Sequence, residues 1–559
     1  MEGQSRKWMV LVATIWIQAF TGTNLDFPSY SSTLKSVLGI SQLQLNFLAV
    51  ASDMGKVFGW CSGFSLMHFP LWLVMFFAAF MGLFAYGLQW LLLSKFISLP
   101  YSLVFMLCLT AGCSICWFNT VSFVLCIKNF PTNRALALSL TISFNGVSAA
   151  LYFLIANAID PTDNTLYLLL NALVPLLVSI LALLPILHQL PSHQLASHAA
   201  TPLDSYIFLI LYILAIFTGL YLLLLNPLSY VSSTACILLG GAIFLLLIPL
   251  CLPALFSKNL ARLVFRPNSN PNDSRFNLVD TNNLELVKEL IGSTENGNSL
   301  NGNISNGMIE KEGCWLSCFW KVIEKQRLTM LGEEHPAYLT VRKWDFWLYY
   351  FTYLCGGTIG LVYSNNLGQI AESLGYNTYL SSLITLYSSM SFFGRLLSAA
   401  PDFLRNKVYF ARTGWLAVAI VPMPIGLFLL VLTGSKEALY GCTCLVGLSS
   451  GFVFAAAVSI TSELFGPNSA GVNHNILITN IPIGSLVYGL FAAIVYDSNA
   501  GSRSLLQTLV GVEMVCMGRQ CYMTTFIAWT CISLVGVVSG FVLFLRTRPA
   551  YDRFERDRT

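Results

Sequence analysis

The stretch "RKWMVLVATIWIQAFTGT", residues 6–23, decides the fold because its features recur in the second half of the chain. It opens on the triplet RKW, which also opens an apolar segment at 342–344, and it closes on Gly22 and Thr23, which a shift of 335 residues places on Gly357 and Thr358. The same shift pairs further residues: Gly59 with Gly394, Gly112 and Ser114 with Gly447 and Ser449, Phe130 with Phe465, Asn133 with Asn468, and Asn145 with Asn480. One register that holds across five apolar segments predicts an internal repeat.

The composition predicts a membrane protein. Of the 559 residues, 56% are hydrophobic and 10% are charged, and the mean hydropathy is +0.68. Soluble domains average about 25% charged residues. The net charge of +4 is small and the basic residues are scattered, so no nucleic-acid surface is expected. The basic start runs directly into a full apolar span without a small-residue cleavage site, which argues against a signal peptide.

A membrane-spanning helix needs about 20 mainly apolar residues. Fourteen such spans are predicted, at 8–27, 44–67, 71–93, 99–126, 135–158, 165–188, 204–225, 232–254, 344–370, 380–400, 412–434, 438–461, 472–496 and 522–546. The first six and the last six are the two copies of the repeat, and the two spans between them are an insertion that we expect to be a peripheral, lipid-facing hairpin. The predicted fold is therefore an all-α polytopic membrane protein with two six-helix halves and two extra central spans.

Basic residues favour the cytoplasmic ends of spans, and their distribution here predicts that both termini are cytoplasmic. The predicted organisation has five parts: a six-span bundle over 1–190, the inserted spans over 204–254, a cytoplasmic linker over 255–343, a second bundle over 344–546, and a basic cytoplasmic tail over 547–559. The linker contains "STENGNSLNGNISNG" and is predicted to be disordered because its composition is polar. The sequence does not distinguish the plasma membrane from an endomembrane.

Several motifs carry a resemblance to a known family. They are "GTNLDFPSYSSTLK", "DMGKVFGWCSGFSLMHFPLW", "NFPTNRALALSLTISFNG" and "ELFGPNSAGVNHN", and they cover nearly the whole chain apart from the linker. They resemble the plant nodulin-like proteins of the major facilitator superfamily, the group that includes the nuclear-fusion-defective-type proteins, and the second half is remotely similar to oxalate and formate exchangers. The resemblance implies two six-helix bundles and a solute carrier, without naming a substrate.

The signature loop of this superfamily carries a Gly, a nearby Asp and basic residues that latch the cytoplasmic side. In the first half the corresponding loop reads "GWCSGFSLMHFP" and has no acid, Lys or Arg, whereas the second half offers "GRLLSAAPDFLRNK". We therefore expect a one-sided latch that uses Arg395 and Asp402. Arg134, at the inner end of the fifth span, lies where a gate would form, although it also fits the preference for positive charge on the inside.

The motif "ASDMGKVFGW", residues 51–60, places Asp53 and Lys56 on one face of the second span, about 14 Å from its outer end. A lone charge at that depth costs roughly 2.5–3.5 kcal/mol, so such residues usually face a partner or a cavity. In one interpretation Asp53 binds a coupling proton or cation, and Lys56 either tunes the pKa of Asp53 or holds an anionic substrate. In the other, the two form a structural ion pair, or Lys56 extends to the cytoplasmic surface.

Other polar side chains lie within the predicted spans. Asn24 is expected to line a cavity, whereas Asp26 is expected to be a solvated cap near the outer end of the first span. Asn145 and Asn480 are matched by the repeat, so they are candidates either for solute binding at comparable depths or for helix–helix hydrogen bonds. His474 is a candidate proton relay or a structural histidine.

Together these features predict a secondary transporter that moves a small polar or anionic solute by alternating access, with protons as a candidate coupling ion. The alternative is a membrane receptor or scaffold built on a transporter fold. No enzymatic activity, cofactor or metal is expected, because no catalytic grouping, nucleotide-binding loop or metal-ligand spacing is present. The expected partners are a small-molecule substrate and the lipid bilayer, with a monomer as the expected state. A disulfide between Cys516 and Cys521, in or beside an external loop, is left open.

Overall fold

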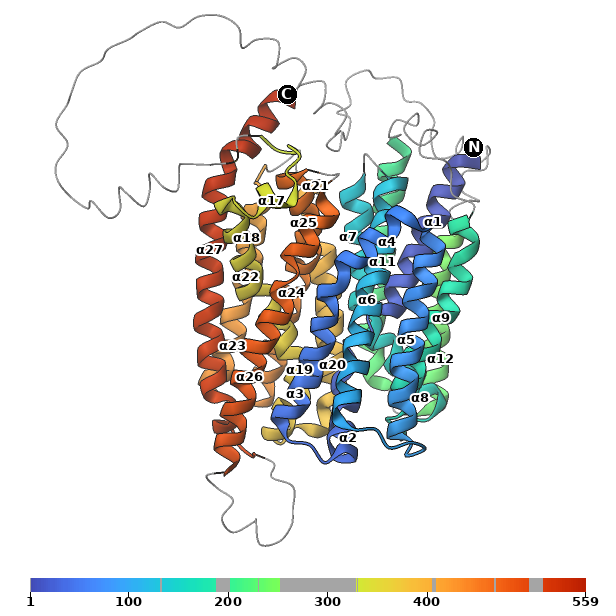
Figure 1. Cartoon of the computed structure of the whole chain (residues 1–559), viewed down its shortest axis with the longest axis vertical. Helices are drawn as coiled ribbons and strands as arrows, with labels where there is room; N and C mark the ends of the chain where they lie inside the picture. Colours follow the sequence, from blue (N-terminus) through green and yellow to red (C-terminus); the bar gives the residue numbers. More distant parts are fainter. Residues whose placement is uncertain are drawn as a thin grey trace, which may run out of the picture.

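The computed structural model describes residues 2–130, 133–187, 202–229, 231–251, 328, 330–404, 409–466, 469–501 and 516–558. Within these ranges the only regular structure is helical, as the sequence predicted. The N-terminal and C-terminal ends of the chain lie at the same face of the molecule (Figure 1).

The first half and the insertion contain the following elements: α1 (Glu2–Thr21), α2 (Phe27–Leu38), α3 (Gln42–Gly55), η1 (Lys56–Phe58), α4 (Gly59–His68), α5 (Leu71–Leu93), α6 (Tyr101–Asn129), α7 (Arg134–Gly146), α8 (Ser148–Ile159), α9 (Leu166–Leu187), α11 (Pro202–Leu225), η2 (Asn226–Leu228), α12 (Ser232–Leu247) and η3 (Ile248–Cys251). The second half contains α17 (Ala337–Thr340), α18 (Trp344–Tyr353), η4 (Leu354–Thr358), α19 (Ile359–Ser373), η5 (Asn377–Tyr379), α20 (Leu380–Leu397), α21 (Ala400–Leu404), α22 (Arg412–Ile420), α23 (Pro422–Leu432), α24 (Lys436–Phe465), α25 (Ala470–Leu477), α26 (Asn480–Gly501) and α27 (Gln520–Arg558).

Among the described residues, ten helices are long and apolar enough to cross a membrane, which establishes an integral membrane protein. The other four predicted spans coincide with α1–α2, α3–α4, α18–α19 and α20. Three of these are interrupted: the first at residues 22–26, the second by η1 and the third by the π-helical η4. Breaks of this kind free backbone groups inside the membrane and are tolerated where they are buried in protein or line a cavity.

The structure refines three of the expected boundaries. The first span was expected to end at residue 27, but α2 continues the chain to Leu38. The segment predicted to be a basic tail, 547–559, continues α27, which runs without interruption to Arg558. Most of the linker predicted over 255–343 lies outside the described residues, but its last part is ordered: Leu331 is buried, and the backbone N–H of His335 donates to the carbonyl of Phe465.

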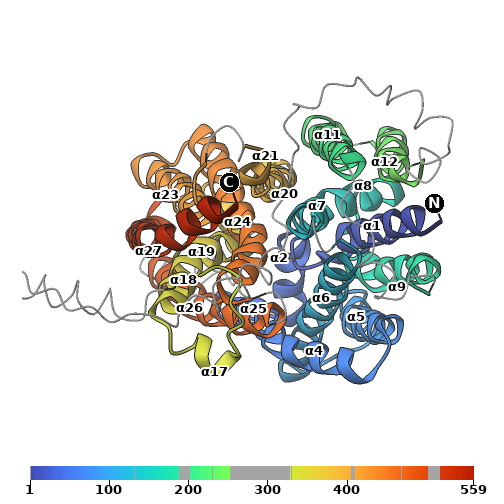
Figure 2. The ribbon, with the colours of Figure 1, turned by 90° about the horizontal axis from the view of Figure 1, so that it is seen from above.

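The inserted hairpin α11–α12 has an exposed apolar face, but it is more than a peripheral element. Viewed from above, it lies beside α7, α8 and α20 (Figure 2). The ammonium of Lys7 pairs with the buried carboxylate of Asp204 at 2.8 Å, and Tyr212 donates to the carbonyl of Leu136. Asn226 donates both to the carbonyl of Ala150 in the first half and to the hydroxyl of Thr385 in the second. The hairpin is therefore bonded to both halves.

Two bundles stand side by side in the view from above, one formed by α1–α9 and the other by α18–α27 (Figure 2). They contact each other along two main pairs of helices, α3 with α26 and α7 with α20, and also through α2 with α19 and α4 with α25. Their polar contacts form what we call the seam, the interface between the two halves. The seam is where the residues singled out by the sequence come together.

Candidate functional site

Asp53 lies at the α3–α26 side of the seam. It is 2% exposed and stands two residues before the end of α3, where Gly55 packs against the backbone of Leu109 and Cys113 in α6. The ammonium of Lys56 lies 2.6 Å from one of its carboxylate oxygens. The hydroxyl of Ser485 in α26 donates a hydrogen bond to the other oxygen. The charge of Asp53 is therefore neutralised within its own half, while its second oxygen is bonded by the opposite half.

Near the N-terminal end of α3, Asn46 bonds to both α19 and α26 of the second half. The amide of Asn46 donates to the side-chain oxygen of Asn366 at 3.2 Å and to the carbonyl of Gly489 at 3.1 Å. Sequence reasoning missed both Asn46 and Ser485. The only signal for them in the sequence is that they are polar residues within apolar segments. Nothing in the sequence links them to partners more than 300 residues away.

Arg395 lies at the α7–α20 side of the seam and is 5% exposed. Its guanidinium donates to the carbonyl of Ile142 at 3.0 Å and to the side-chain oxygen of Asn145 at 2.8 Å, both in α7. It also lies over the ring of Phe454 at 5.6 Å. Every group that contacts Arg395 in these interactions is uncharged, so its positive charge has no carboxylate partner among the described residues.

Close backbone packing brings Arg395 and Asn145 together. Gly146 follows Asn145 and faces Phe392, where an added methyl group would stand 2.7 Å from the backbone nitrogen of Phe392. One turn before Phe392, Ser388 donates to the carbonyl of Gly146. The absence of a side chain at residue 146 therefore lets the two helices approach closely, which holds the guanidinium within reach of Asn145.

The remaining residues predicted within the spans have different environments. Asn480 is fully buried and bonded within its own half, because it accepts from Thr358 and donates to the carbonyl of Leu477, both at 2.8 Å. The structure thus brings Asn145, but not Asn480, to Arg395. His474 in α25 lies edge-on to Phe123 of α6, with ring centroids 6.3 Å apart, so it contacts the opposite half through its ring.

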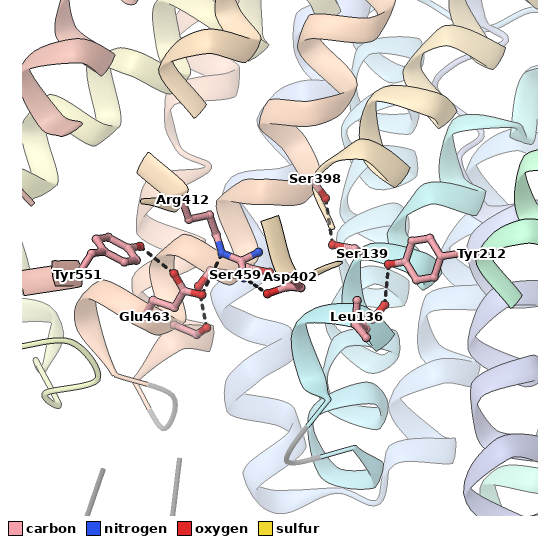
Figure 3. A network of polar contacts seen from close by, with 10 residues as sticks. Leu136, Ser139, Tyr212, Ser398, Asp402, Arg412, Ser459, Glu463 and Tyr551 are labelled. Atoms are coloured by element: carbon pink, nitrogen blue, oxygen red, sulfur yellow. Dashed lines mark hydrogen bonds and ion pairs between the residues drawn. The ribbon is translucent and has the colours of Figure 1, made fainter. Parts of the chain in front are cut away.

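The predicted latch residues Arg395 and Asp402 are not bonded to each other. Asp402 instead accepts from Arg412 at 2.6 Å, and Arg412 also pairs with Glu463 at 2.9 Å (Figure 3). Tyr551 of α27 donates to the second oxygen of Glu463 at 2.7 Å. We call Asp402, Arg412, Glu463 and Tyr551 the charge cluster.

The charge cluster lies beside two further contacts (Figure 3). The hydroxyl groups of Ser139 and Ser398 are 2.9 Å apart and join the two halves, and Tyr212 of the hairpin bonds to Leu136. Arg134, at the first position of α7, is half-buried and close enough to Glu463 to interact electrostatically. The predicted gate region thus contains contacts between the halves in addition to the bonds within the charge cluster.

A small cavity lies between α2, α3, α5 and α6 of the first half, and Asn365 of α19 contributes to its lining. Its lining includes Asn24 and Asp53 of the predicted set, together with Gln89 of α5 and Asn365 of the second half. The space between atoms is about 380 Å³ including the open mouth, but little of it is wide enough for more than a water molecule. The halves also contact each other toward both faces of the molecule, through Asn46 with Asn366 and through Ser139 with Ser398.

A disulfide joins Cys516 and Cys521 at the start of α27. The amide of Cys516 also donates to the hydroxyl of Tyr496 at 3.1 Å. The question that the sequence left open is thus answered, and this end of α27 is tied to α26.

Comparisons with known proteins agree with this architecture. Residues 7–254 match the Nodulin-like family, and residues 330–553 match the family described as NFD4, C-terminal domain. The chain is 52% identical to Protein NUCLEAR FUSION DEFECTIVE 4 of Arabidopsis thaliana, over the whole chain and 92% of that protein. It is 27% identical to Probable transporter MCH1 of Wickerhamomyces anomalus over 25% of the chain and 29% of that protein.

Among solved structures, the chain is similar to a proton:xylose symporter of the major facilitator superfamily bound to 6-bromo-6-deoxy-D-glucose. The TM-score is 0.50 and the identity 12%, over 96% of this chain and 95% of the other. At that identity the likeness concerns the fold alone. Taken with the two family matches and the relative that aligns along the entire chain, the arrangement of the helices leads to one conclusion: the protein belongs to the plant nodulin-like family of NFD4-type membrane proteins and has the major facilitator fold.

Proposed function

We propose that this protein is a secondary transporter that moves a small polar or anionic solute across its membrane by alternating access, with protons as the coupling ion. The observation that carries the proposal is Arg395. It is a buried arginine at the seam whose Nη1 donates to two neutral groups of the opposite half, and whose Nε is buried without a partner among the described residues. A buried charge without a counter-charge is costly, and a guanidinium is well shaped to bind a carboxylate.

The proposed binding step follows from this geometry. When the two halves part at α7 and α20, Arg395 loses the carbonyl of Ile142 and the amide oxygen of Asn145. A solute anion can then replace both neutral acceptors, and it forms stronger hydrogen bonds because both partners are charged. Asn145, whose amide nitrogen has no hydrogen-bond partner in this conformation, can donate to the same solute.

The proposed gating step uses the contacts at the two ends of the seam. At one end, α2 contacts α19 and Asn46 bonds to Asn366; at the other, Ser139 bonds to Ser398 and α4 contacts α25. To open one end of the seam, only the contacts at that end must break, while the contacts at the other end remain intact. Asp53 and Ser485 lie between these ends, so we assign them a role in holding the seam closed, and we assign the charge cluster a role as the latch of the second half.

The names of the relatives support the proposal at a coarser level. One is a probable transporter and the structural neighbour is a symporter that moves a sugar with protons. Since one fold hosts many functions, these names favour transport without indicating the solute. The anionic character that we propose depends on Arg395 alone.

The test is uptake into proteoliposomes with an imposed pH gradient, using a panel of small carboxylates and neutral polar metabolites. Wild-type protein should accumulate an anion. The Arg395→Gln variant should lose about tenfold or more of that uptake, since a hydrogen bond to a charged group contributes roughly 1.5–3 kcal/mol. Arg395→Lys should retain part of it. Arg548→Gln is the matched control, because Arg548 is an exposed arginine paired only with Asp552 four residues away.

Uptake of a neutral solute that is equally fast in Arg395→Gln would contradict the anionic proposal but keep the carrier. Failure of folded wild-type protein to move any member of the panel, with or without a gradient, would favour the receptor or scaffold alternative.

A further inference from the structure

Asp26 lies in the break between α1 and α2 and is 1% exposed. The sequence alone suggested a solvated cap near the outer surface, and this is wrong because the span continues for the twelve residues of α2. At 1.5 Å per residue, α2 is about 18 Å long. The carboxyl group of Asp26 therefore lies near the middle of a hydrocarbon layer about 30 Å thick.

One side chain is bonded to this carboxyl group. The amide nitrogen of Asn171 in α9 lies 3.1 and 3.0 Å from its two oxygens. The titratable groups around it come from several elements and belong to one buried cluster: Tyr30 of α2, Tyr86 of α5, Cys108 of α6, Tyr152 of α8 and Tyr167 of α9. No Lys or Arg from these elements, or from α3, α19 and α20, which also pack on α2, bonds to Asp26 among the described residues.

Asp26 and Asp53 thus differ in one respect that matters for protons. Asp53 has the ammonium of Lys56 at 2.6 Å as a positive partner. A deprotonated Asp26 would be a buried negative charge with no positive partner, which is costly in the membrane interior. In this conformation the neutral acid is therefore the stable form of Asp26.

Asn171 can serve both protonation states. An amide can donate from its nitrogen or accept at its oxygen, and a half-turn of the group exchanges the two ends. With the nitrogen facing Asp26 the amide donates to a carboxylate; turned over, its oxygen accepts from the O–H of a carboxylic acid. In the present orientation the amide oxygen of Asn171 is buried and bonds to no described residue.

A route from Asp26 to the seam is also present. The small cavity is lined by the chain on either side of Asp26, at Asn24 and Phe27, and by Asn365 of the second half. Because α2 contacts α19 of the opposite half, separation of the halves at that end moves the surroundings of Asp26 and opens the cavity.

We infer that Asp26, held by Asn171, is the carboxyl group that takes up and releases the coupling proton. This inference rests on the proposed function and moves the coupling role from Asp53 to Asp26. In one conformation the O–H bond of the acid breaks, its electron pair stays on the carboxylate, and the proton leaves to water on one face. In the other conformation the carboxylate takes a proton from water on the opposite face. The conformation described above, in which the halves contact each other toward both faces, holds the neutral acid.

The test compares uptake with and without a pH gradient in proteoliposomes containing wild type, Asp26→Asn, Asp53→Asn or the exposed-loop control Asp160→Asn. The gradient should accelerate uptake by wild type, Asp53→Asn and Asp160→Asn. In Asp26→Asn, uptake should fall to the same rate with and without the gradient, while exchange of solute across the membrane persists. Asp26→Glu, which keeps an acid, should retain a response to the gradient. The inference is overturned by gradient-driven uptake in Asp26→Asn, or by its loss in Asp53→Asn instead.

The role of Asn171 has a separate measurement. Asn171→Leu removes the donor that stabilises the carboxylate, so the half-maximal pH of gradient-driven uptake should move upward relative to wild type. A merely structural role would lower the rate at every pH without moving this midpoint. An unchanged midpoint in folded Asn171→Leu would therefore overturn the assignment to Asn171.

A measurement that needs no substrate separates this inference from the proposed function. Infrared spectroscopy of the purified protein detects the carbonyl band of a protonated carboxyl group. Wild type should show such a band, and Asp26→Asn should lack it while Asp53→Asn keeps it. If Asp26→Asn lacks the band and the wild type transports no solute, the proposed function is contradicted but the assignment of Asp26 as the proton site is supported. A band that persists in Asp26→Asn would overturn the proton site whatever the transport result.

Discussion

The hydroxyl of Ser485 in the second half donates a hydrogen bond to the carboxylate of Asp53 in the first, while Lys56 pairs with the other oxygen of the same carboxylate at 2.6 Å. The carboxylate of Asp53 thus forms an ion pair within its own half and accepts a hydrogen bond from the other half. Each partner can be removed separately, and the two removals have different consequences.

Lys56→Gln should destabilise the protein by about 3–5 kcal/mol, because removal of one partner leaves a buried charge uncompensated. The double variant Asp53→Asn, Lys56→Gln should recover most of that loss, since no charge then remains. Thermal unfolding of the detergent-solubilised protein measures both effects. Equal destabilisation in the single and double variants would show that the two side chains are not energetically coupled.

Arg412→Gln should be among the most destabilising single changes in the second half, costing several kcal/mol, because it leaves the carboxylates of Asp402 and Glu463 without their cation. Tyr551→Phe removes only one hydrogen bond and should cost about 1 kcal/mol. The matched control Arg548→Gln breaks an exposed pair with Asp552 and should change stability by no more than about 0.5 kcal/mol. Similar melting temperatures for Arg412→Gln and Arg548→Gln would contradict the charge cluster.

Gly146→Ala should destabilise the protein by roughly 1–3 kcal/mol and slow transport, because the added methyl group collides with the backbone of Phe392 across the seam. Gly87→Ala is the control, since a methyl group at residue 87 of α5 meets open space. That change should be neutral or slightly stabilising, as alanine is the better helix former. A tolerated Gly146→Ala variant with full uptake would mean that α7 and α20 are not packed this closely during the cycle.

Cys516 and Cys521 allow the predicted orientation to be tested. Disulfides persist on the oxidising side of a membrane, so the loop that contains them should be external and both termini should be cytoplasmic. A membrane-impermeant thiol reagent added to intact cells should label two more thiols after reduction in wild type than in the double variant Cys516→Ser, Cys521→Ser. Equal labelling of the two proteins under reducing conditions would place this loop on the inside. The loop-closure model gives about 2 kcal/mol for the stability lost on removing such a short bridge.

The helical fold could be predicted because its signals are local or periodic. A span needs a run of apolar residues, and the repeat is visible as one register through Gly22, Gly59 and Asn145. The end of the first span was misplaced because Asn24, Asp26 and Pro28 have the composition of a helix end. In the structure Asn24 and Asp26 lie in a break that the surrounding helices cover, and Pro28 lies in the first turn of α2.

The candidate site could be predicted only as a set of polar residues, and not as pairs. The Asp53–Lys56 pair was accessible because it is separated by one helical turn. The bonds of Asp53 to Ser485 and of Arg395 to Asn145 join helices hundreds of residues apart, and nothing in the sequence records them. The partner of Asp402 was misidentified for a related reason: a familiar motif spacing favoured Arg395, whereas the fold points Arg395 toward α7 and brings Arg412 to Asp402.

The inserted hairpin makes the two edges of the molecule unequal. Asn226 is bonded at once to Ala150 in one half and to Thr385 in the other, and α11 packs on both α7 and α20. A movement of the halves that keeps these bonds is therefore restrained at Thr385, while Arg395, about 15 Å farther along α20, can still part from α7. The opposite edge, where Asn46 meets Asn366, then travels farthest, so the solute should enter and leave along α3 and α26 rather than through an opening of equal width on both sides.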